Sequence, residues 1–285
     1  MYARFVRTDQ PNPPTPANHG RGMPEEPAIH VERFAEVDST SAYARARIGA
    51  GVLADGPAAF VAARQTAGVG RFGRPWSSPI GGLWLTLAWP IDEGELAARV
   101  DGLGLRVGVA CLRVVRGAFE DFEGDPHVRL KWPNDVLIHG RKVLGVLTEV
   151  VHGPPPAARP WILVGVGLNA NVSSEHLAEP VRSHATSLAH ELGFEVDLAT
   201  LERALLAELR SALTTTGLSR EVIHEAGEFL HGLERDATVS LPDGSRVSGV
   251  LTGLNEHGMA VLNVDGRVYV SPVGSVIGND QTEKP

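Results

Sequence analysis

The sequence contains one cysteine, only three lysines and no long apolar run. A single cysteine excludes an internal disulfide and is typical of a reducing compartment, so we expect a cytoplasmic location. No apolar stretch is long enough for a membrane span, and no signal peptide is predicted, because a basic segment followed by an apolar block is missing at the start. The formal net charge of -8 disfavours binding to nucleic acid, since phosphate neutralisation requires a basic face.

The pattern of apolar and turn residues predicts three regions. Residues 1–28 are rich in proline and predict a disordered tail, too short for a DNA-binding helix-turn-helix domain. Residues 29–233 predict an α+β domain, a mixed sheet flanked by helices. Residues 234–280 contain short strands separated by glycine-containing turns, which predicts a small barrel.

Within these regions, single segments can be assigned from their periodicity. Strands are expected at 60–63, 83–89, 128–132, 136–138, 143–151 and 161–168, and in the small barrel at 238–241, 246–254, 259–264 and 267–270. Helices are expected at 96–119 and, starting at an Asp197 N-cap, at 198–213.

A glycine-rich loop at residues 65–79 is the most informative segment. It combines glycine backbone with guanidinium groups: Gly68, Gly70, Arg71, Gly73 and Arg74. No acidic residue occurs from 56 to 91, so the loop is locally cationic on an acidic molecule. This composition favours binding of a phosphate or carboxylate.

Residues 68–73 also satisfy the GxGxxG pattern of dinucleotide-binding folds. That fold requires a helix directly after the third glycine. Pro75, Pro79, Gly81 and Gly82 follow instead, and these residues oppose a helix. We therefore reject a dinucleotide fold. The Lys-Ser/Thr of a phosphate-binding Walker loop is also missing, and so are the His-Arg-Asp and Asp-Phe-Gly motifs of protein kinases.

Two further motifs lie downstream. In Lys131-Trp-Pro-Asn-Asp135, a cation and a carboxylate flank a turn, and Lys142 opens the next strand. Alone, this pattern is more typical of an ordinary hairpin with a surface ion pair than of a binding site. The strand at 161–168 contains Gly165 and Gly167, and glycine inside a strand is costly unless a ligand or backbone passes close by.

Together and in this order, the motifs resemble those of the biotin–protein ligase family. The family has Gly-Arg-Gly-Arg-x-Gly-Arg-x-Trp, Lys-Trp-Pro-Asn-Asp, Lys-x-x-Gly-Ile-Leu and Gly-Ile-Gly-x-Asn, and the resemblance extends over roughly residues 31–280. It also includes the segment 38–41, which is similar to the family's Ser-Thr-Asn. Two positions depart from the pattern: Val69 replaces an arginine and Ser41 replaces an asparagine. Val69 removes one guanidinium from the loop, so weaker retention of the intermediate is expected.

The resemblance implies a ligase with an SH3-like C-terminal barrel. It implies activation of biotin by ATP to biotinyl-5′-AMP, with Mg²⁺ accompanying ATP and no fixed metal ligands. The biotinyl group is then transferred to a lysine of a biotin carboxyl carrier protein. A homodimer is compatible with this expectation. The resemblance also implies roles for individual residues. Those expected in catalysis are Lys142, Arg71, Asp135 and Lys131. Those expected at biotin are Ser39, Thr40, Ser41, Gln65, Gly70, Arg71, Lys142 and Gly145. Those expected at ATP or the adenylate are Gly68, Arg74, Trp76, Asn134, Gly165, Gly167 and Asn169.

Alternative interpretations remain open at this point. A lipoate or octanoyl protein ligase shares the fold, and a biotin-sensing regulator or an inactive biotin-binding module belongs to another class. Trp76 can be a plain core residue, and Ser39 and Thr40 can form a helix cap. Capping the helix and binding biotin are compatible roles for these residues.

Overall fold

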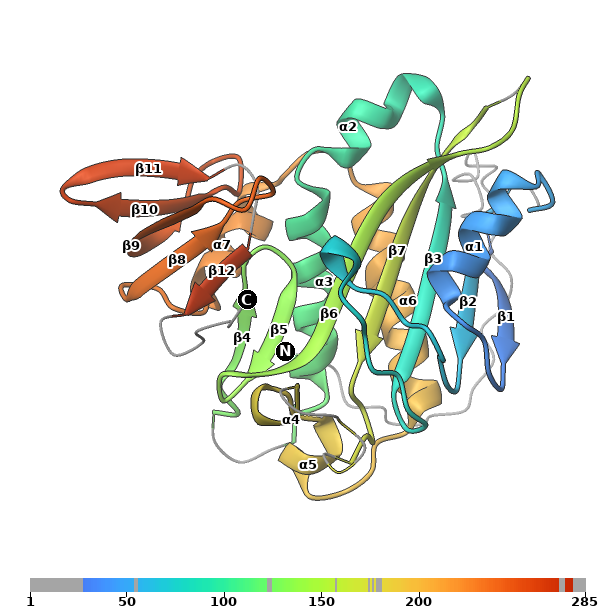
Figure 1. Ribbon diagram of the computed structural model, residues 1–285, viewed down its shortest axis with the longest axis horizontal. Helices are drawn as coiled ribbons and strands as arrows, with labels where there is room; N and C mark the ends of the chain where they lie inside the picture. Colours follow the sequence, from blue (N-terminus) through green and yellow to red (C-terminus); the bar gives the residue numbers. More distant parts are fainter. Residues whose placement is uncertain are drawn as a thin grey trace, which may run out of the picture.

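In the computed structural model, two β-sheets lie side by side, one large and one small (Figure 1). The structure describes residues 28–53, 56–121, 125–156, 158–173, 175, 177, 181–271 and 275–278. Nearly all of the tail predicted at residues 1–28 therefore lies outside the described residues.

The larger sheet has seven strands in the order β1-β2-β3-β7-β6-β5-β4. Their bounds are β1 His30–Phe34, β2 Ala58–Ala62, β3 Leu83–Pro90, β4 Val128–Lys131, β5 Asp135–Ile138, β6 Arg141–His152 and β7 Pro160–Leu168. β1 and β2 are parallel, and every other neighbouring pair is antiparallel. The predicted mixed sheet is confirmed. β3 is apolar along nearly its whole length, which suits a strand inside the sheet, between β2 and β7, with both faces buried.

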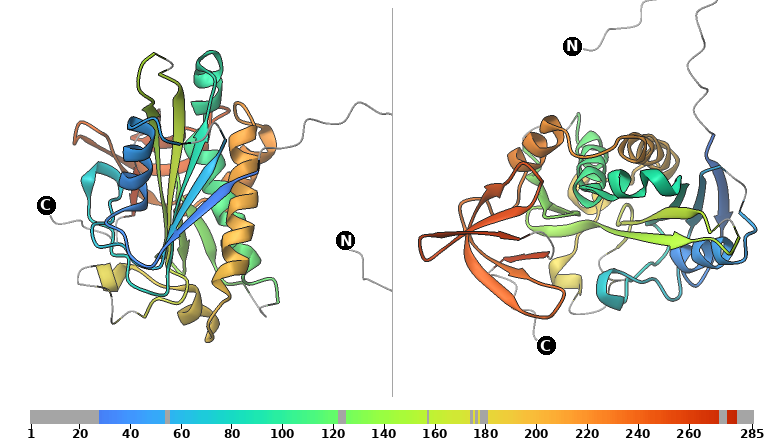
Figure 2. Two further views of the ribbon diagram at one scale, coloured as in Figure 1. Left: turned by 90° about the vertical axis from the view of Figure 1, so that its right-hand side faces the viewer. Right: turned by 90° about the horizontal axis from the view of Figure 1, so that it is seen from above.

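Helices cover both faces of this sheet (Figure 2). Their bounds are α1 Thr40–Gly49, α2 Leu96–Val100, α3 Leu103–Gly117, α4 Val181–His184, α5 Leu188–Leu192, α6 Leu198–Thr214 and α7 Arg220–Glu228. α3 and α6 pack on one face, in a core that includes Leu83, Leu85 and Leu87 of β3. α1 packs on the opposite face, where Ala44 and Ile48 contact a second cluster. The predicted helix after Asp197 is confirmed, and the Asp197 side chain caps it.

The helix predicted at 96–119 is interrupted in the structure. α2 ends at Val100 and α3 begins at Leu103, because Gly102 adopts a left-handed conformation with φ of 61°. The buried guanidinium of Arg106 holds this break, since it donates hydrogen bonds to the carbonyls of Arg99 and Asp101. The prediction of one continuous helix was wrong here.

The smaller sheet has five antiparallel strands in the order β11-β10-β9-β8-β12, consistent with the predicted SH3-like barrel. Their bounds are β8 Asp236–Ser240, β9 Arg246–Leu254, β10 Ala260–Val264, β11 Arg267–Ser271 and β12 Ser275–Gly278. The first four match predicted strands, whereas β12 was not predicted. The indole of Trp132 donates a hydrogen bond of 2.9 Å to the carbonyl of Gly258, which ties this sheet to the larger one.

The chain passes from one sheet to the other between α7 and β8, where we propose the boundary between domains 29–233 and 234–280. Across the described residues, every helix is too short or too polar to cross a membrane.

Candidate functional site

The glycine-rich loop forms an irregular hairpin on the α1 side of the large sheet. Gln65 pairs with Ser78 at its base, and the N–H of Trp76 donates to the carbonyl of Gly68 at 2.8 Å. The N–H of Gly70 donates to the carbonyl of Arg74, also at 2.8 Å. A single 3-10 turn at Arg71–Gly73 is followed by extended chain rather than by an α-helix. This geometry agrees with the rejection of a dinucleotide fold.

The tip of the loop carries two guanidinium groups around one exposed ring. Phe72 has a φ of 58° and is 61% exposed. The guanidinium carbons of Arg71 and Arg74 lie 5.2 and 5.8 Å from the centre of its ring. Burial lowers the pKa of Arg71, and Asp135 opposes this shift. The loop therefore presents a partly desolvated cation toward the strands below it.

Lys142 and Asp135 form an ion pair on adjacent strands. Lys142 Nζ lies 2.7 Å from an oxygen of Asp135, and both side chains are partly shielded from solvent. The same Nζ lies 5.0 Å from the centre of the Trp76 ring. Asp135 faces Lys131 in the β4–β5 register. The sequence motifs separated by more than 50 residues thus meet around one lysine.

The indole of Trp76 packs directly on the glycines of β6 and β7. Gly145 and Gly167 are paired in register. A Cβ atom at Gly167 would lie 2.4 Å from Trp76 Nε1, and one at Gly145 would lie 3.0 Å from the same indole. Only glycine permits this approach. Trp76 Nε1 is buried and has no hydrogen-bond partner among the described residues. Trp76 also borders the apolar cluster around Trp84, so it is both a core and a site residue.

Two asparagines connect the strands around this cluster. Asn134 accepts a hydrogen bond of 3.3 Å from Arg71 and donates to the carbonyl of Val146. The Asn169 side chain is buried and donates to the carbonyl of Thr186. Asn134 therefore joins the loop to the β4–β5 turn, whereas Asn169 anchors the segment that precedes α5.

A second group of polar residues lies at the start of α1. Ser39 caps the helix, because its hydroxyl oxygen accepts from the N–H of Ala42. The N–H and hydroxyl of Thr40 both donate to Gln65 Oε1, at 2.8 and 3.1 Å. Ser41 contacts the hydroxyl of Thr86 on β3. Thr86 was not among the predicted site residues. A single threonine in a strand of apolar residues could have indicated a polar contact there.

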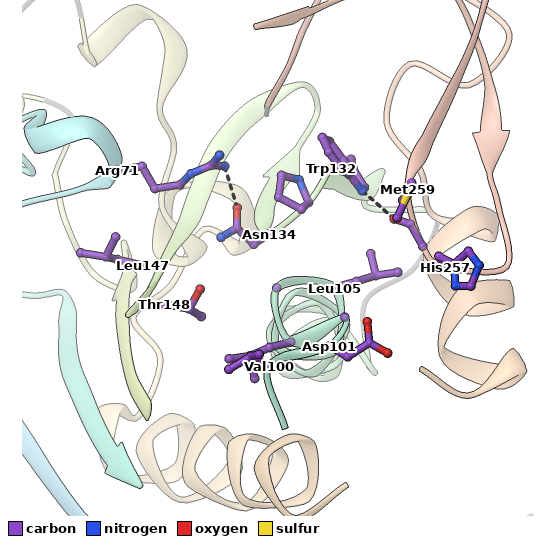
Figure 3. A pocket seen from close by; sticks show the side chains of 15 residues that line it. Arg71, Val100, Asp101, Leu105, Trp132, Asn134, Leu147, Thr148, His257 and Met259 are labelled. Atoms are coloured by element: carbon purple, nitrogen blue, oxygen red, sulfur yellow. Dashed lines mark hydrogen bonds between the residues drawn. The ribbon is translucent and has the colours of Figure 1, made fainter. Parts of the chain in front are cut away.

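Two cavities adjoin these groups. The first, here called the α1 cavity, has a volume of about 300 Å³. Its lining residues are Ser39, Ser41, Ala42, Arg45, Val69, Gly70, Phe72, Gly73, Leu147 and Glu149. The second, of about 340 Å³, lies between the start of α3, the turn after β4 and the β9–β10 turn (Figure 3). Arg71 and Asn134 border it on one side and His257 on the other. Arg71 thus lies between the group formed by Lys142, Asp135 and Trp76 and the second cavity, which reaches the smaller sheet.

Two further predicted site residues, Arg74 and Lys131, lie at the edge of these groups. Arg74 remains at the loop tip beside Phe72. Lys131 acts electrostatically on His231, whose pKa is lowered mainly by burial and next by this lysine. No group of three or more His, Cys, Asp or Glu side chains suited to a metal occurs within the described part of the chain.

Comparisons with known proteins agree with this geometry. Residues 36–169 match the model of the biotin/lipoate A/B protein ligase family. The chain is 33% identical over 239 residues to the bifunctional ligase/repressor BirA of Escherichia coli, covering 81% of this chain and 68% of that protein. It is 31% identical over 252 residues to a biotin–[acetyl-CoA-carboxylase] ligase of Mycobacterium tuberculosis, covering 87% and 88%. The solved structure of biotin protein ligase from Aquifex aeolicus with biotin and ATP superposes with a TM-score of 0.70 at 27% identity, covering 87% of this chain and 97% of that one.

Proposed function

The chain belongs to the biotin/lipoate A/B protein ligase family, and we infer that it is a biotin–protein ligase. It joins biotin to ATP and then passes the biotinyl group to a lysine of a biotin carboxyl carrier protein. The observation that carries this proposal is the convergence of Lys142, Asp135, Trp76 and Arg71 beside the polar group at the start of α1.

In the first step, a carboxylate oxygen of biotin attacks the α-phosphorus of ATP. The bond to the pyrophosphate oxygen breaks, and biotinyl-5′-AMP forms. Two anions must approach each other, so the barrier falls mainly through positioning and positive charge. Lys142 holds the biotin carboxylate and then the adenylate phosphate. Arg71, already partly desolvated, supplies a second cation from the loop. Trp76, which packs on Gly167, borders the nucleotide, whereas Gly165 lies beside Ser41 and Thr86.

In the second step, the neutral amine of the carrier lysine attacks the acyl carbon. An amide bond forms, AMP leaves, and the amine loses a proton. In this proposal Asp135 orients that amine or accepts its proton, once the ligand competes for Lys142, its partner in the ion pair. The carrier lysine therefore approaches from the side of Asp135.

Mg²⁺ accompanies ATP in this proposal. Mg²⁺ is usually held by one or two carboxylates together with substrate phosphates and water. Asp135 is the carboxylate beside Lys142, and the described residues offer no cluster of three or more ligands, so a metal carried by the nucleotide fits these residues better than a resident one. The metal supplies charge neutralisation to the leaving pyrophosphate.

Biotin-dependent ATP–pyrophosphate exchange tests the first step, and transfer of labelled biotin to a purified carrier domain tests the second. We expect both activities in the purified chain and their loss in Arg71→Ala. Exchange that depends on lipoate but not on biotin would show that the chain is a lipoate ligase instead.

A regulator that binds DNA is the alternative from another class, because one relative is a bifunctional ligase/repressor. We propose ligase activity without repression, in the cytoplasm, on the basis of the acidic charge and the single cysteine. Salt-sensitive, sequence-specific operator binding by the full chain would contradict this. Sedimentation of the purified protein with and without biotin distinguishes a monomer from the homodimer that the resemblance allows.

A further inference from the structure

Thr86 is buried in the middle of β3, and the other residues of this strand are apolar. Its neighbours on the same face of the strand, Trp84 and Ala88, belong to two separate hydrophobic clusters. The Thr86 hydroxyl lies 2.8 Å from Thr40 Oγ1 and 2.9 Å from Ser41 Oγ. A valine would fill the same space without a polar atom to satisfy, so burial alone does not explain a threonine here.

The direction of each hydrogen bond at this hydroxyl follows from its neighbours. The backbone N–H of Thr40 can only donate, which identifies the atom of Gln65 that it contacts as the amide oxygen. The Thr40 hydroxyl also donates to this oxygen. Because a hydroxyl has one proton, Thr86 must donate to Thr40, and Ser41 must then donate to Thr86.

The hydrogen bonds beyond Gln65 have the same direction. The amide nitrogen of Gln65 donates to the Ser78 hydroxyl at 2.8 Å, and Ser78 donates to the carbonyl of Trp76. A carbonyl can only accept. Reversing the protons would leave the hydroxyl oxygen of Thr40 against the amide oxygen of Gln65 with no proton between them. The hydrogen bonds therefore run in one direction, from Ser41 to the carbonyl of Trp76.

We propose that Thr86 is a positioning residue that makes Ser41 a hydrogen-bond acceptor toward the α1 cavity. Ser41 lines this cavity, and its single proton is used on Thr86, so the cavity meets its lone pairs. Ser39 lines the same cavity as a hydrogen-bond donor. Its oxygen accepts from the N–H of Ala42 in the helix cap, so its hydroxyl proton is available to a ligand. Gly165, which pairs with Thr86, leaves room for Ser41, because a Cβ atom there would lie 2.8 Å from Ser41 Oγ.

This arrangement selects a ligand head group with an N–H donor beside a carbonyl acceptor. The cyclic urea of biotin has both groups, whereas the dithiolane ring of lipoate has neither. The inference rests on the proposed function and adds which atoms of the ligand the chain recognises: a urea N–H at Ser41 and the urea carbonyl at Ser39. A buried acceptor left without a donor is costly, so ligands without this N–H are disfavoured.

The test compares Thr86→Val, which keeps the shape of the side chain, with Thr86→Ser, which keeps the hydroxyl. We expect Thr86→Val to raise the Kd of biotin about tenfold in calorimetry, equivalent to about 1.4 kcal/mol, with the Kd of ATP measured without biotin unchanged. Thr86→Ser should restore biotin binding to within about threefold of the parent. Thr238→Val is the matched control, because it removes a hydroxyl pair with Ser248 on the smaller sheet and should leave biotin binding unchanged.

Biotin analogues methylated at either urea nitrogen complete the test. The parent protein should discriminate against one of them, and Thr86→Val should lose that discrimination. Ser41→Ala, which leaves the bond from Thr86 to Thr40 in place, should lose it too, and this second variant serves if Thr86→Val does not fold. Unchanged biotin binding in Thr86→Val, or equal discrimination in parent and variants, would overturn the inference. A different result would contradict the proposed function itself: no biotin-dependent ATP–pyrophosphate exchange in the parent protein.

Discussion

An alanine at Gly167 tests whether Trp76 is held on the strand glycines. The added Cβ would lie 2.4 Å from Nε1 and 2.5 Å from Cε2 of the indole. Ordinary contact begins at 3.4 Å, so the ring must retreat by about 1 Å. The partly buried indole also packs against the cluster around Trp84, which limits how far it can withdraw. Lys142, whose Nζ lies 5.0 Å from the ring centre, must then change its environment as well.

Overpacking of this kind costs roughly 1–3 kcal/mol. For a chain of this size each kcal/mol lowers Tm by about 2–4 °C, so we expect a decrease of roughly 2–12 °C for Gly167→Ala. We also expect slower biotin-dependent ATP–pyrophosphate exchange, because the nucleotide side of the site is displaced. Differential scanning calorimetry and the exchange assay measure the two effects.

Gly227→Ala is the matched control. This glycine lies near the end of α7, and a Cβ atom added to it would have no neighbour within 4 Å, so alanine there should be neutral or stabilising by up to about 1 kcal/mol. Adding Trp76→Phe to Gly167→Ala should recover at least half of the lost Tm, since the smaller ring lacks the atoms that clash. A Gly167→Ala protein with parental Tm and activity would refute the close packing of the indole.

Three further outcomes are expected. Lys142→Ala should reduce adenylate formation by more than about 100-fold in the exchange assay, and normal turnover would mean that the site is misplaced. His231 has a pKa lowered by burial and by Lys131, so the unfolded chain binds more protons below about pH 6.5 and stability should be lost as the pH falls. His231→Gln should weaken this loss in urea titrations between pH 7.5 and pH 5.5, and an unchanged dependence would contradict it. Trp132→Phe removes the hydrogen bond to the Gly258 carbonyl and should cost about 1–2 kcal/mol in urea unfolding, with parental stability as the contrary result.

The elements that could be predicted from sequence are those with a strong local pattern. The strand expected at 83–89 is observed as Leu83–Pro90, and the helix after Asp197 ends one residue beyond the expected position, at Thr214. Prolines and glycines after the GxGxxG pattern correctly excluded a helix at the loop. In each case neighbours in the sequence determine the outcome, so periodicity and turn chemistry were sufficient.

The features that could not be predicted depend on partners distant in sequence. The helix break at Gly102 is held by Arg106, which also donates to the carbonyls of Ala212 and Gly217. The strand glycines indicated that a ligand or backbone passes close by, and in the structure the close neighbour of Gly167 is the indole of Trp76. No local pattern identifies an indole that arrives from a loop about 90 positions earlier.

Trp76 belongs both to the hydrogen-bond series at the start of α1 and to the group around Lys142. This shared residue bears on how the binding of the two substrates is linked. Trp76 ends the hydrogen-bond chain from Ser41 with its backbone carbonyl, while its side chain packs on Gly167 and faces Lys142. In the proposed function Trp76 borders the nucleotide, so a head group bound at Ser41 would contact a series of hydrogen bonds that ends at a nucleotide-binding residue. Residues of one hydrogen-bond network are coupled energetically, commonly by 0.5–3 kcal/mol. If Trp76 borders the nucleotide as proposed, we expect this loop to couple biotin binding to nucleotide binding.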